Sequence, residues 1–352
     1  MLLEENILLA PFTTLGIGGP ARWFVRATSE EEIAEAAAWA GEHGQLLFVL
    51  GGGSNLLIAD AGFDGLVVQI SLRGITRREA PDDSGQVIYE VAAGEDWDTF
   101  VGRAVADKCA GIECLAGIPG TVGGTPVQNV GAYGQEVAST IECVQAYDLM
   151  EHRFVEFTAS ECGFAYRRSR FNAADRGRYI VTRVSYRLKP GGAPTLRYAD
   201  LQRTFPAGCD ASLMEVAAEV RRIRQSKGML LVAGDPDCRS AGSFFKNPVV
   251  NEDQVRQMAV SIGQEPPRFP AGPEPDNAGR VKIPAAWLIE QAGFTKGYVL
   301  GAAGVSSRHT LALINRGGAT AAEILSLAER IADAVEARFG IHLEMEPVLV
   351  GL

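Results

Sequence analysis

The segment 241–248 brings together residue types that could do acid–base chemistry: a hydroxyl, an ammonium and an amide, supplied by Ser243, Lys246 and Asn247. Gly242 lets another group approach the backbone closely beside that hydroxyl. If the segment is a strand, its alternation sends Phe244 and Phe245 to opposite faces, and the polar groups stand among aromatic walls. A mostly apolar lining with a few placed polar groups is typical of a substrate pocket. The alternative is a buried structural strand that ends at Pro248.

Two glycine-rich segments have the makings of ligand-binding loops. The first, 51–55, reads Gly-Gly-Gly-Ser-Asn and directly follows a predicted buried strand at 46–50. Its glycines allow positive φ and leave backbone N–H groups accessible to an anion, with a flexible turn as the alternative. The second, 116–134, intersperses glycine with apolar residues, so we expect it to be packed and ordered. Close approach of its backbone to a large planar or pyrophosphate ligand would explain that composition.

Neither loop is a Walker motif, since no Gly-Lys-Ser/Thr follows at the required distance. The run Gly16-x-Gly18-x-x-Ala21 does match the loose dinucleotide-binding pattern. We expect no strand before this run, and Pro20 would interrupt the required turn, so we interpret the match as chance. A cofactor would therefore be held by a different scaffold.

The composition narrows the function classes. A formal net charge of −10 over 352 residues argues against a general nucleic-acid surface, but it allows a local site for an anionic small ligand. The chain lacks an apolar run of about 18 residues and its first residues do not resemble a signal peptide, so we expect a cytoplasmic protein that does not enter a membrane. The cysteines form no Cys-x-x-Cys pair and the histidines show no ligand spacing, so we expect reduced thiols and no metal.

Capping residues and apolar spacing predict the elements that must position these groups. Helices are expected after the caps Ser29 and Asp96, over 213–227, from Pro284 as first residue to Gln291, and from the capping box of Thr320 and Glu323 to about Phe339. Strands are expected at 23–27, 46–50, 67–70, 87–92, 144–148, 179–188 and 342–350. We expect a turn at 189–192 and a loose Pro/Gly stretch at 263–279. Because helices and strands alternate irregularly, the predicted class is α+β, with two or three domains.

Taken together, these segments resemble the UDP-N-acetylenolpyruvoylglucosamine reductase family, also called UDP-N-acetylmuramate dehydrogenases. Its members are flavoenzymes that complete the muramic acid sugar of peptidoglycan. The resemblance runs nearly end to end and rests on the segments 13–21, 50–57, 118–133, 166–171, 198–201, 241–248 and 343–346. The glycine loops alone are also similar to the broader vanillyl-alcohol-oxidase-type flavin family. The segment around Ser243 and the Tyr166-Arg-x-Ser-x-Phe pattern are more specific.

The resemblance implies a two-subdomain FAD-binding unit of that broader type, followed by an α+β substrate-binding domain. The implied boundaries are 1–71 for the first FAD subdomain, onto which a strand at 340–352 packs back, 72–225 for the second and 226–339 for the substrate domain. The implied ligands are FAD, NADPH and a UDP-sugar. The implied FAD-binding residues are Gly51, Gly52, Gly53, Ser54, Asn55, Gly117, Gly120, Thr121, Gly123 and Gly124.

The resemblance also implies a reaction in two halves. NADPH gives hydride to FAD, and reduced FAD gives hydride to C3 of the enolpyruvyl group. Arg167 would hold the substrate carboxylate, Ser243 would deliver the proton to C2, and Glu346 would act on the enolate with a raised pKa or a shared proton. Glu344 competes with Glu346 for that role, and register favours Glu346. The implied UDP-sugar contacts are Tyr198, Lys227, Asn247 and Gln291.

The Tyr198-x-Asp200-Leu201 run looks like the family branch with an extra substrate-covering loop. The run from Lys227 to Ser243 is longer than in many members, which leaves open how Lys227 reaches the UDP phosphates. Two other functions stay open: a flavin oxidase of an alcohol or sugar, and a non-catalytic nucleotide-sugar binding protein. The first would not explain a set of Ser243, Arg167 and Glu346, and the second would be expected to lack one of them. The oligomeric state is open, with a monomer as the expectation.

Overall fold

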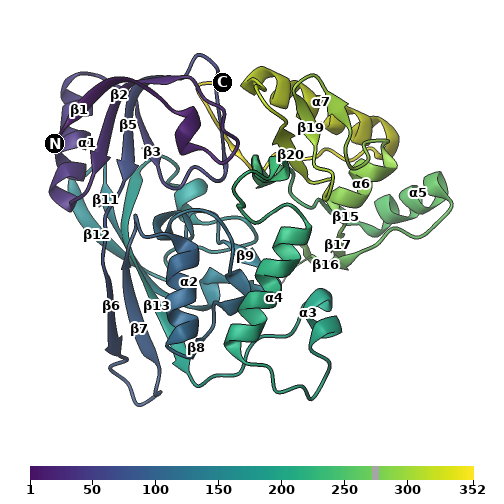
Figure 1. The fold of residues 1–352 in the computed structure, drawn as a ribbon, viewed down its shortest axis with the longest axis horizontal. Coiled ribbons are helices and arrows are strands. Elements are labelled where there is room, and N and C mark those ends of the chain that lie inside the picture. Colours follow the sequence, from purple (N-terminus) through teal and green to yellow (C-terminus); the bar gives the residue numbers. More distant parts are fainter. Residues whose placement is uncertain (272–276) are drawn as a thin grey trace. The chain divides into compact units, whose positions relative to one another are not determined.

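The computed structural model describes residues 1–271 and 277–352. The chain divides into two compact units, each with its own hydrophobic core (Figure 1). Unit 1 comprises residues 1–7, 21–53 and 64–225, and unit 2 comprises 8–20, 54–63 and 226–352. Within the described residues, no helix is both long and apolar enough to cross a membrane. The three-domain division expected from the sequence stays a prediction.

The first sheet of unit 1 carries the strand that leads into the first glycine loop. Its order is β1 (Leu3–Leu8), β2 (Pro20–Ala27), β5 (Phe63–Ile70) and β3 (Leu47–Leu50), and β3 runs parallel to β5. Helix α1 (Glu30–Glu42) starts at Ser29, whose side chain accepts from the Glu32 N–H. The Glu32 carboxylate accepts from the Thr28 N–H at 2.7 Å, so Ser29 and Glu32 do not form a reciprocal capping box.

The second sheet of unit 1 is antiparallel and carries the second loop. Its order is β12 (Arg153–Thr158), β11 (Ile141–Asp148), β13 (Tyr179–Pro190), β7 (Val87–Ala92) and β6 (Ile75–Glu79), with β8 (Cys109–Ala110) paired to β13. Helices α2 (Trp97–Ala106) and α4 (Leu213–Ser226) lie side by side in Figure 1 and are joined by an ion pair. Smaller elements are the hairpin β9 (Gly131–Ala132) and β10 (Gln135–Glu136), and α3 (Ala199–Thr204).

The described part of unit 2 contains short strands together with helices α5, α6 and α7 (Figure 1). One sheet has the order β14 (Ser240–Ser243), β20 (Ala312–Asn315), β19 (Ala303–Val305) and β18 (Val299–Leu300). Another has the order β15 (Val249–Asn251), β17 (Arg280–Lys282) and β16 (Phe269–Pro270). Strand β4 (Leu56–Ile58) pairs in parallel with β21 (Val348–Val350). The helices are α5 (Glu252–Ile262), α6 (Ala285–Gln291) and α7 (Ala321–Phe339).

In helix α7, the local sequence determines where the helix begins, where it ends and which face is buried. The reciprocal bonds of Thr320 and Glu323 form the expected capping box, and Gly340 ends the helix at a φ of 64°. Its buried side chains follow the i, i+3, i+4, i+7 spacing of one helix face: Ala321, Ile324, Leu327, Ala328, Ile331, Ala332, Val335 and Phe339. Spacing of this kind buries one face of a helix against a core.

Several expectations about single elements are wrong. Leu46 is 70% exposed and lies outside β3, three of whose four residues are only partly buried. Lys189 and Pro190 continue β13 by pairing with β8, so the turn begins after Pro190. Pro284 is the N-cap of α6 and not its first helical residue. The C-terminal strand is confined to β21, with one isolated bridge at Met345.

Other elements were not predicted. Helix α5 begins with a capping box of Asn251 and Gln254 that the sequence reading overlooked. The expected loose stretch 263–279 includes strand β16, and its residues 272–276 lie outside the described residues. Strand β1 does precede the Gly16-x-Gly18 run, contrary to expectation, but the run leads into strand β2 rather than a helix. The dinucleotide-binding interpretation therefore still does not apply.

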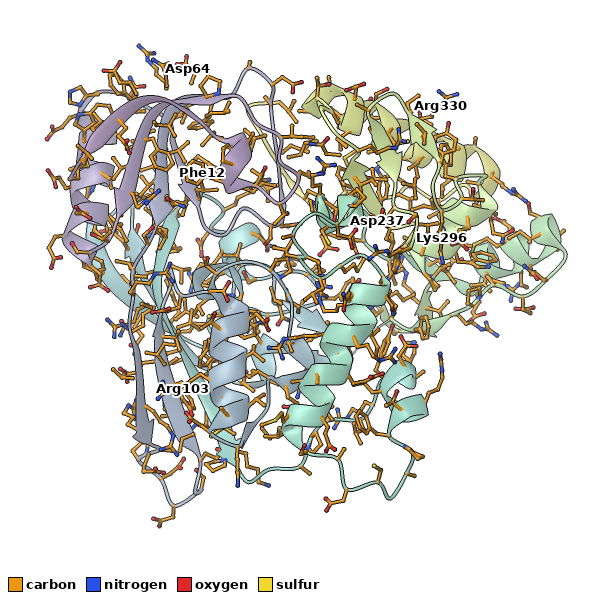
Figure 2. All side chains as sticks on the ribbon, in the orientation of Figure 1. Phe12, Asp64, Arg103, Asp237, Lys296 and Arg330 are labelled. Atoms are coloured by element: carbon orange, nitrogen blue, oxygen red, sulfur yellow. The ribbon has the colours of Figure 1, made fainter. Side chains whose placement is uncertain are left out.

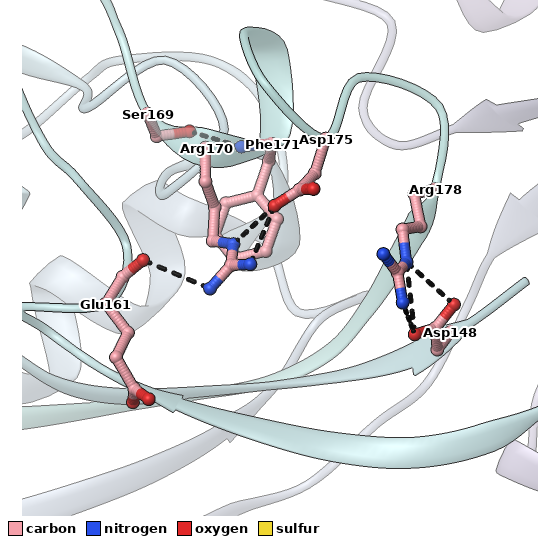
Figure 3. A network of polar contacts seen from close by, with 7 residues as sticks. All are labelled: Asp148, Glu161, Ser169, Arg170, Phe171, Asp175 and Arg178. Atoms are coloured by element: carbon pink, nitrogen blue, oxygen red, sulfur yellow. Dashed lines mark hydrogen bonds and ion pairs between the residues drawn. The ribbon is translucent and has the colours of Figure 1, made fainter. Parts of the chain in front are cut away.

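A polar network stabilises the turn after β11 and the segment 161–178 (Figure 3). Arg178 donates through Nη2 to Asp148 Oδ2 at 2.7 Å and through Nε to Oδ1 at 3.1 Å. Asp148 Oδ1 also accepts from the Met150 N–H at 2.9 Å. The hydrogen bonds from Arg178 are the main cause that lowers the pKa of Asp148 to about 2.

We expect Asp148→Asn to lower the free energy of unfolding at pH 7 by about 1–2 kcal/mol, a value discounted because Arg178 is 32% exposed. The folded pKa lies below the usual 3.8, so the stabilisation is present above about pH 4 and is lost as the pH falls toward about 2. Urea unfolding of both proteins across this range measures the difference. The control Asp64→Asn, from a surface pair that is 54% and 84% exposed, should change little. An Asp148→Asn deficit as large near pH 2 as at pH 7 would contradict this account.

Candidate functional site

The two glycine loops pack directly against each other in unit 1. A Cβ added at Gly52 would lie 2.5 Å from the Gly120 Cα, and one at Gly51 would lie 2.9 Å from Thr121 Oγ1. Real Cβ atoms essentially never approach another atom as closely as 2.5 Å, so the contact needs glycine. Gly53 and Gly120 also have φ values of 64° and 126°, where side chains are strained. We call residues 51–53 and 117–121 the glycine cradle.

Side chains from helices α2 and α4 bind the backbone of the glycine cradle at Gly117. Asp98 accepts from the Gly117 N–H at 2.6 Å and pairs with Arg221 at 2.7 Å. Arg224, only 9% exposed, donates from Nε to the Gly117 oxygen at 2.8 Å. The backbone N–H and the backbone oxygen of Gly117 are thus fixed by side chains from two helices. Sequence reasoning overlooked Asp98 and Arg224, because nothing in the helical spacing marks a charged residue that faces inward.

Gly123 and Gly124 differ in whether the surrounding structure leaves room for a side chain. A Cβ at Gly123 would lie 2.6 Å from the Ala93 Cβ, and the Gly123 N–H donates to the Ala93 oxygen at 2.9 Å. Gly123 therefore has a packing role whether or not it contacts a ligand. A Cβ at Gly124 would meet nothing among the described residues within 4 Å, and Gly124 is exposed.

Arg167 lies at the tip of a tight turn in unit 1. Ala165 and Arg168 exchange backbone hydrogen bonds of 2.9 and 3.1 Å at the base of the turn. The φ of Arg167 is 54°, a left-handed conformation that is uncommon for residues other than glycine. Asn172 stabilises it by donating from Nδ2 to the Arg167 oxygen at 3.1 Å. Strained residues held in this way cluster at functional sites, which supports a functional role for Arg167.

Two buried side chains connect this turn to the second glycine loop. Asn129, 1% exposed, donates from Nδ2 to the Ala165 oxygen at 3.1 Å. Ser169, also 1% exposed, donates from Oγ to the Val127 oxygen at 2.6 Å and accepts from the Phe171 N–H (Figure 3). The Ser and Phe of the Tyr-Arg-x-Ser-x-Phe pattern therefore frame the turn that carries Arg167. Asn129 was not singled out from the sequence, although a lone amide between apolar neighbours could have marked it.

Ser243 is the last residue of β14 and pairs with Ala312 of β20. Gly242 has a φ of 76°, and the pairing register shifts just before Ser243, so the chain leaves the strand there. Phe244 and Phe245 are 0% and 1% exposed, and their rings lie 5.6 Å apart within one core. The expectation that they point to opposite faces of one strand is wrong because the strand has ended. Ser243 is partly buried, and its hydroxyl makes no hydrogen bond with the described residues.

The C-terminal segment runs beside the segment around Ser243. The Glu346 N–H donates to the Phe244 oxygen at 2.9 Å, and Phe245 forms an antiparallel bridge with Met345. Asn55, the last residue of the first glycine loop, donates from Nδ2 to the Glu346 oxygen at 3.2 Å. Unit 2 thus brings the backbones of Ser243, Glu346 and Asn55 together from three distant parts of the chain.

The two candidate carboxylates have different surroundings. Glu344 is 68% exposed and forms an ion pair with Lys246 at 2.5 Å. Glu346 is partly buried. The two carboxylates therefore differ in exposure, and the choice of Glu346 as the enolate partner stays a prediction. Arg167 belongs to unit 1, and its meeting with Ser243 and Glu346 stays a prediction.

The remaining candidates occupy varied positions. Asn247 Oδ1 accepts from the Ala285 N–H at 2.8 Å and so caps α6. Gln291 ends α6 and accepts from Arg338 through its backbone oxygen. Tyr198 is 42% exposed, and its ring forms a T-shaped contact with that of Tyr133, with the ring centroids 5.2 Å apart. Lys227 is partly buried directly after α4. Ser54, at the end of the first loop, accepts from Thr14 Oγ1 through its backbone oxygen at 3.4 Å.

Comparison with known proteins covers both units. A family model described as FAD binding domain matches residues 21–153, and one described as UDP-N-acetylenolpyruvoylglucosamine reductase, C-terminal domain, matches 235–350. The reductase of that name from Thermobifida fusca is 45% identical over 357 residues, which cover 99% of this chain and 98% of the relative. The chain belongs to the UDP-N-acetylenolpyruvoylglucosamine reductase family. The Streptomyces coelicolor member is 46% identical over 354 residues, 98% of this chain and 89% of its own.

A crystal structure of the family's reductase from Thermus caldophilus has the same overall fold. It is 27% identical, covers 99% of this chain and 100% of its own, and has a TM-score of 0.65. The predicted class, α+β with a flavin-binding unit and a C-terminal substrate domain, is therefore confirmed. The cradle suits an FAD-binding domain, because its surface is backbone that side chains would otherwise cover.

We expect Gly52→Ala to reduce the amount of flavin bound per protein and to lower the thermal unfolding temperature. The added Cβ would force the two loops apart, at a cost of about 1–3 kcal/mol. Flavin absorbance relative to protein and a thermal melt measure both effects. The matched control is Gly102→Ala in α2, where a Cβ meets none of the described atoms within 4 Å. That change should stabilise the protein by about 0.5–1 kcal/mol. Normal flavin content and stability in Gly52→Ala would refute the packing argument.

Proposed function

We propose that this chain reduces UDP-N-acetylglucosamine enolpyruvate to UDP-N-acetylmuramate, a precursor of peptidoglycan, with FAD as resident cofactor and NADPH as reductant. The observation that carries the proposal is the match to named reductases along 99% of the chain, both glycine loops and the Ser243 segment included. The proposal is also supported by the contacts within unit 2 that bring the segments of Ser243, Glu346 and Asn55 side by side.

The cofactor would be held by the glycine cradle together with Ser54, Asn55, Gly123 and Gly124. Bound FAD would accept hydride from NADPH and supply hydride to C3 of the enolpyruvyl group. Asp98 and Arg224 would keep the Gly117 peptide in place while the ligand enters. Backbone N–H groups in such loops stabilise phosphate without adding charged side chains.

Ser243 would supply the proton that C2 needs after hydride addition. A serine hydroxyl is a weak acid, but the carbanionic carbon is a strong base, so a positioned hydroxyl suffices. Arg167 would hold the substrate carboxylate through its planar fork and stabilise the charge that spreads into it. Glu346 would share a proton with this site, since a fully ionised carboxylate beside the enolate would repel it.

The UDP-sugar would be bound by Tyr198, Lys227, Asn247 and Gln291. The side-chain oxygen Oδ1 of Asn247 already accepts from the Ala285 N–H at the start of α6. Asn247 would therefore contact the substrate by donating from Nδ2. Tyr198 has an exposed face that could cover a ligand, with its other side supported by Tyr133.

A colour assay tests the function as a whole. The purified protein should be yellow, should bleach on addition of NADPH without air, and should regain colour when UDP-N-acetylglucosamine enolpyruvate is added. Recovery by oxygen alone, with no response to the enolpyruvyl sugar, would favour an oxidase and overturn the proposal.

Ser243→Ala should abolish the return of colour on addition of the enolpyruvyl sugar while leaving bleaching by NADPH nearly unchanged. The hydroxyl acts only on the carbon that forms in the second half-reaction, where general-acid catalysis is worth about 10²–10⁴ in rate. Stopped-flow absorbance of the two halves measures each rate separately, and the NADPH half serves as the internal control. Equal loss in both halves would exclude this role.

Glu346→Gln should slow the second half-reaction strongly, while Glu344→Gln should leave its rate near that of the unmodified protein. The two carboxylates are two residues apart, yet Glu344 is exposed and paired with Lys246. The same stopped-flow assay compares them, and the comparison controls for loss of one negative charge from this segment. If Glu344→Gln is the slower variant, the carboxylate assignment is wrong.

A further inference from the structure

One carboxylate of unit 1, that of Glu113, is fully buried and accepts three hydrogen bonds. Glu113 is 0% exposed and begins the short 3-10 helix Glu113–Leu115. Its Oε1 accepts from Gln135 Nε2 and from the Thr195 N–H, each at 2.8 Å. Its Oε2 accepts from the Gly111 N–H at 2.8 Å. Glu113 thus joins three stretches of chain, and the most distant of them reaches Tyr198 three residues after Thr195.

The residue after Glu113 binds the same two partners. The Cys114 N–H donates to Gln135 Oε1 at 2.7 Å, and Cys114 Sγ donates to the Thr195 oxygen at 3.2 Å. Burial, and then the charge of Glu113, raise the pKa of the Cys114 thiol, so it keeps its proton and remains a donor. Gln135 Nε2 also donates to Thr195 Oγ1 at 3.2 Å. The backbone N–H and oxygen of Thr195 are therefore held by the side chains of Glu113 and Cys114.

The contact begun at Gln135 and Thr195 continues along both segments to Tyr198. A Cβ at Gly134, whose φ is 85°, would lie 3.2 Å from the Arg197 Cβ and 3.9 Å from the Tyr198 nitrogen. The rings of Tyr133 and Tyr198 form the T-shaped contact at the far end. A single ring contact is too weak to order several exposed residues, because fixing the backbone of even one residue costs a comparable free energy. The hydrogen bonds at Thr195 therefore supply the firm end of this contact.

We propose that Glu113 is a positioning residue, which holds segment 195–198 so that Tyr198 is presented to the UDP-sugar. The role of Tyr198 rests on the proposed function, whereas the attachment of the segment to Glu113 rests on contacts within unit 1. Because Glu113 is fully buried, it acts through the segment and not on the ligand.

Glu113→Gln removes this attachment while keeping the size of the side chain. A carboxylate offers two acceptor oxygens, which here serve three donors. An amide has one acceptor oxygen and an NH2 group, so either orientation sets the NH2 group against a donor.

Limited digestion with trypsin tests the attachment without any substrate. In flavin-loaded Glu113→Gln, cleavage after Arg197 should be about tenfold faster than in the unmodified protein. The bond after Arg103 lies within α2 (Figure 2), so its cleavage reports general loosening and should not change. Glu142→Gln is the matched control, since it alters another carboxylate of unit 1 that accepts from Arg187 at 2.6 and 2.7 Å. It should leave cleavage after Arg197 unchanged. Unchanged cleavage there in Glu113→Gln, or equal acceleration at both bonds, would overturn the inference.

Half-reaction kinetics test whether the attachment serves the ligand. Glu113→Gln should raise the KM for the enolpyruvyl sugar about tenfold and leave the rate of flavin reduction by NADPH unchanged, a split that lost stability alone would not produce. Tyr198→Ala should raise the same KM, and adding Glu113→Gln to it should cause no further rise, because Glu113 acts through Tyr198. Effects that multiply in the double variant, or a KM unaffected by Tyr198→Ala, would contradict this role. If the protein does not turn over the enolpyruvyl sugar at all, the proposed function fails and the trypsin result still decides on the attachment.

A second pair of variants decides the question if Glu113→Gln does not fold. Cys114→Ala removes the hydrogen bond from Sγ to the Thr195 oxygen and leaves Glu113 in place. Cleavage after Arg197 should then be about threefold faster. Cys109→Ala is the matched control, since Cys109 is also 0% exposed but its Sγ donates to the Asp107 oxygen. Equal cleavage after Arg197 in these two variants would overturn the inference.

Discussion

The exclusion of side chains between Gly52 and Gly120 is the constraint on which unit 1 depends. Two loops separated by some 65 residues of chain can form one surface only if neither carries a Cβ at the contact. The surrounding helices help to maintain this contact, since Asp98 and Arg224 bind the N–H and the backbone oxygen of Gly117. The turn of Arg167 is then attached to the same loop through Asn129 and Ser169. The backbone proposed to bind FAD and the side chain proposed to bind the substrate carboxylate thereby share one support.

Unit 2 also brings together segments that are distant in sequence, but it does so through backbone hydrogen bonds rather than through contacts between glycines. The segment around Ser243 and the segment around Glu346 lie about 100 residues apart in sequence, and backbone hydrogen bonds place them side by side. The aromatic rings of Phe244 and Phe245 anchor the first segment in the core just after the strand ends. The polar groups of Ser243, Lys246 and Glu346 are thus supported by buried apolar neighbours, as the composition of segment 241–248 indicated.

Local sequence signals were sufficient to predict the elements whose hydrogen bonds are formed between residues close in sequence. The caps Ser29, Asp96 and Thr320 start helices where expected, because a capping side chain acts within three residues. The C-terminal strand and the alternation at Phe244 were predicted wrongly, since both depend on where a distant partner stops pairing. Glu113 and Arg224 were not foreseen for the same reason, because a charged residue becomes buried only when the tertiary structure supplies its partners. The glycine loops could be located from composition, whereas their mutual contact could not.

Ser169 and Asn129 make their decisive bonds to the backbone oxygens of Val127 and Ala165 rather than to side chains. Every amino acid supplies such an oxygen, so those two partner positions could change type without breaking the attachment. In a remote homologue, the amide and the hydroxyl would persist as identifiable landmarks while their neighbours drift. Aligning such a sequence on these two anchors, instead of on the glycines between them, would locate the arginine turn even where the loop itself has altered beyond recognition.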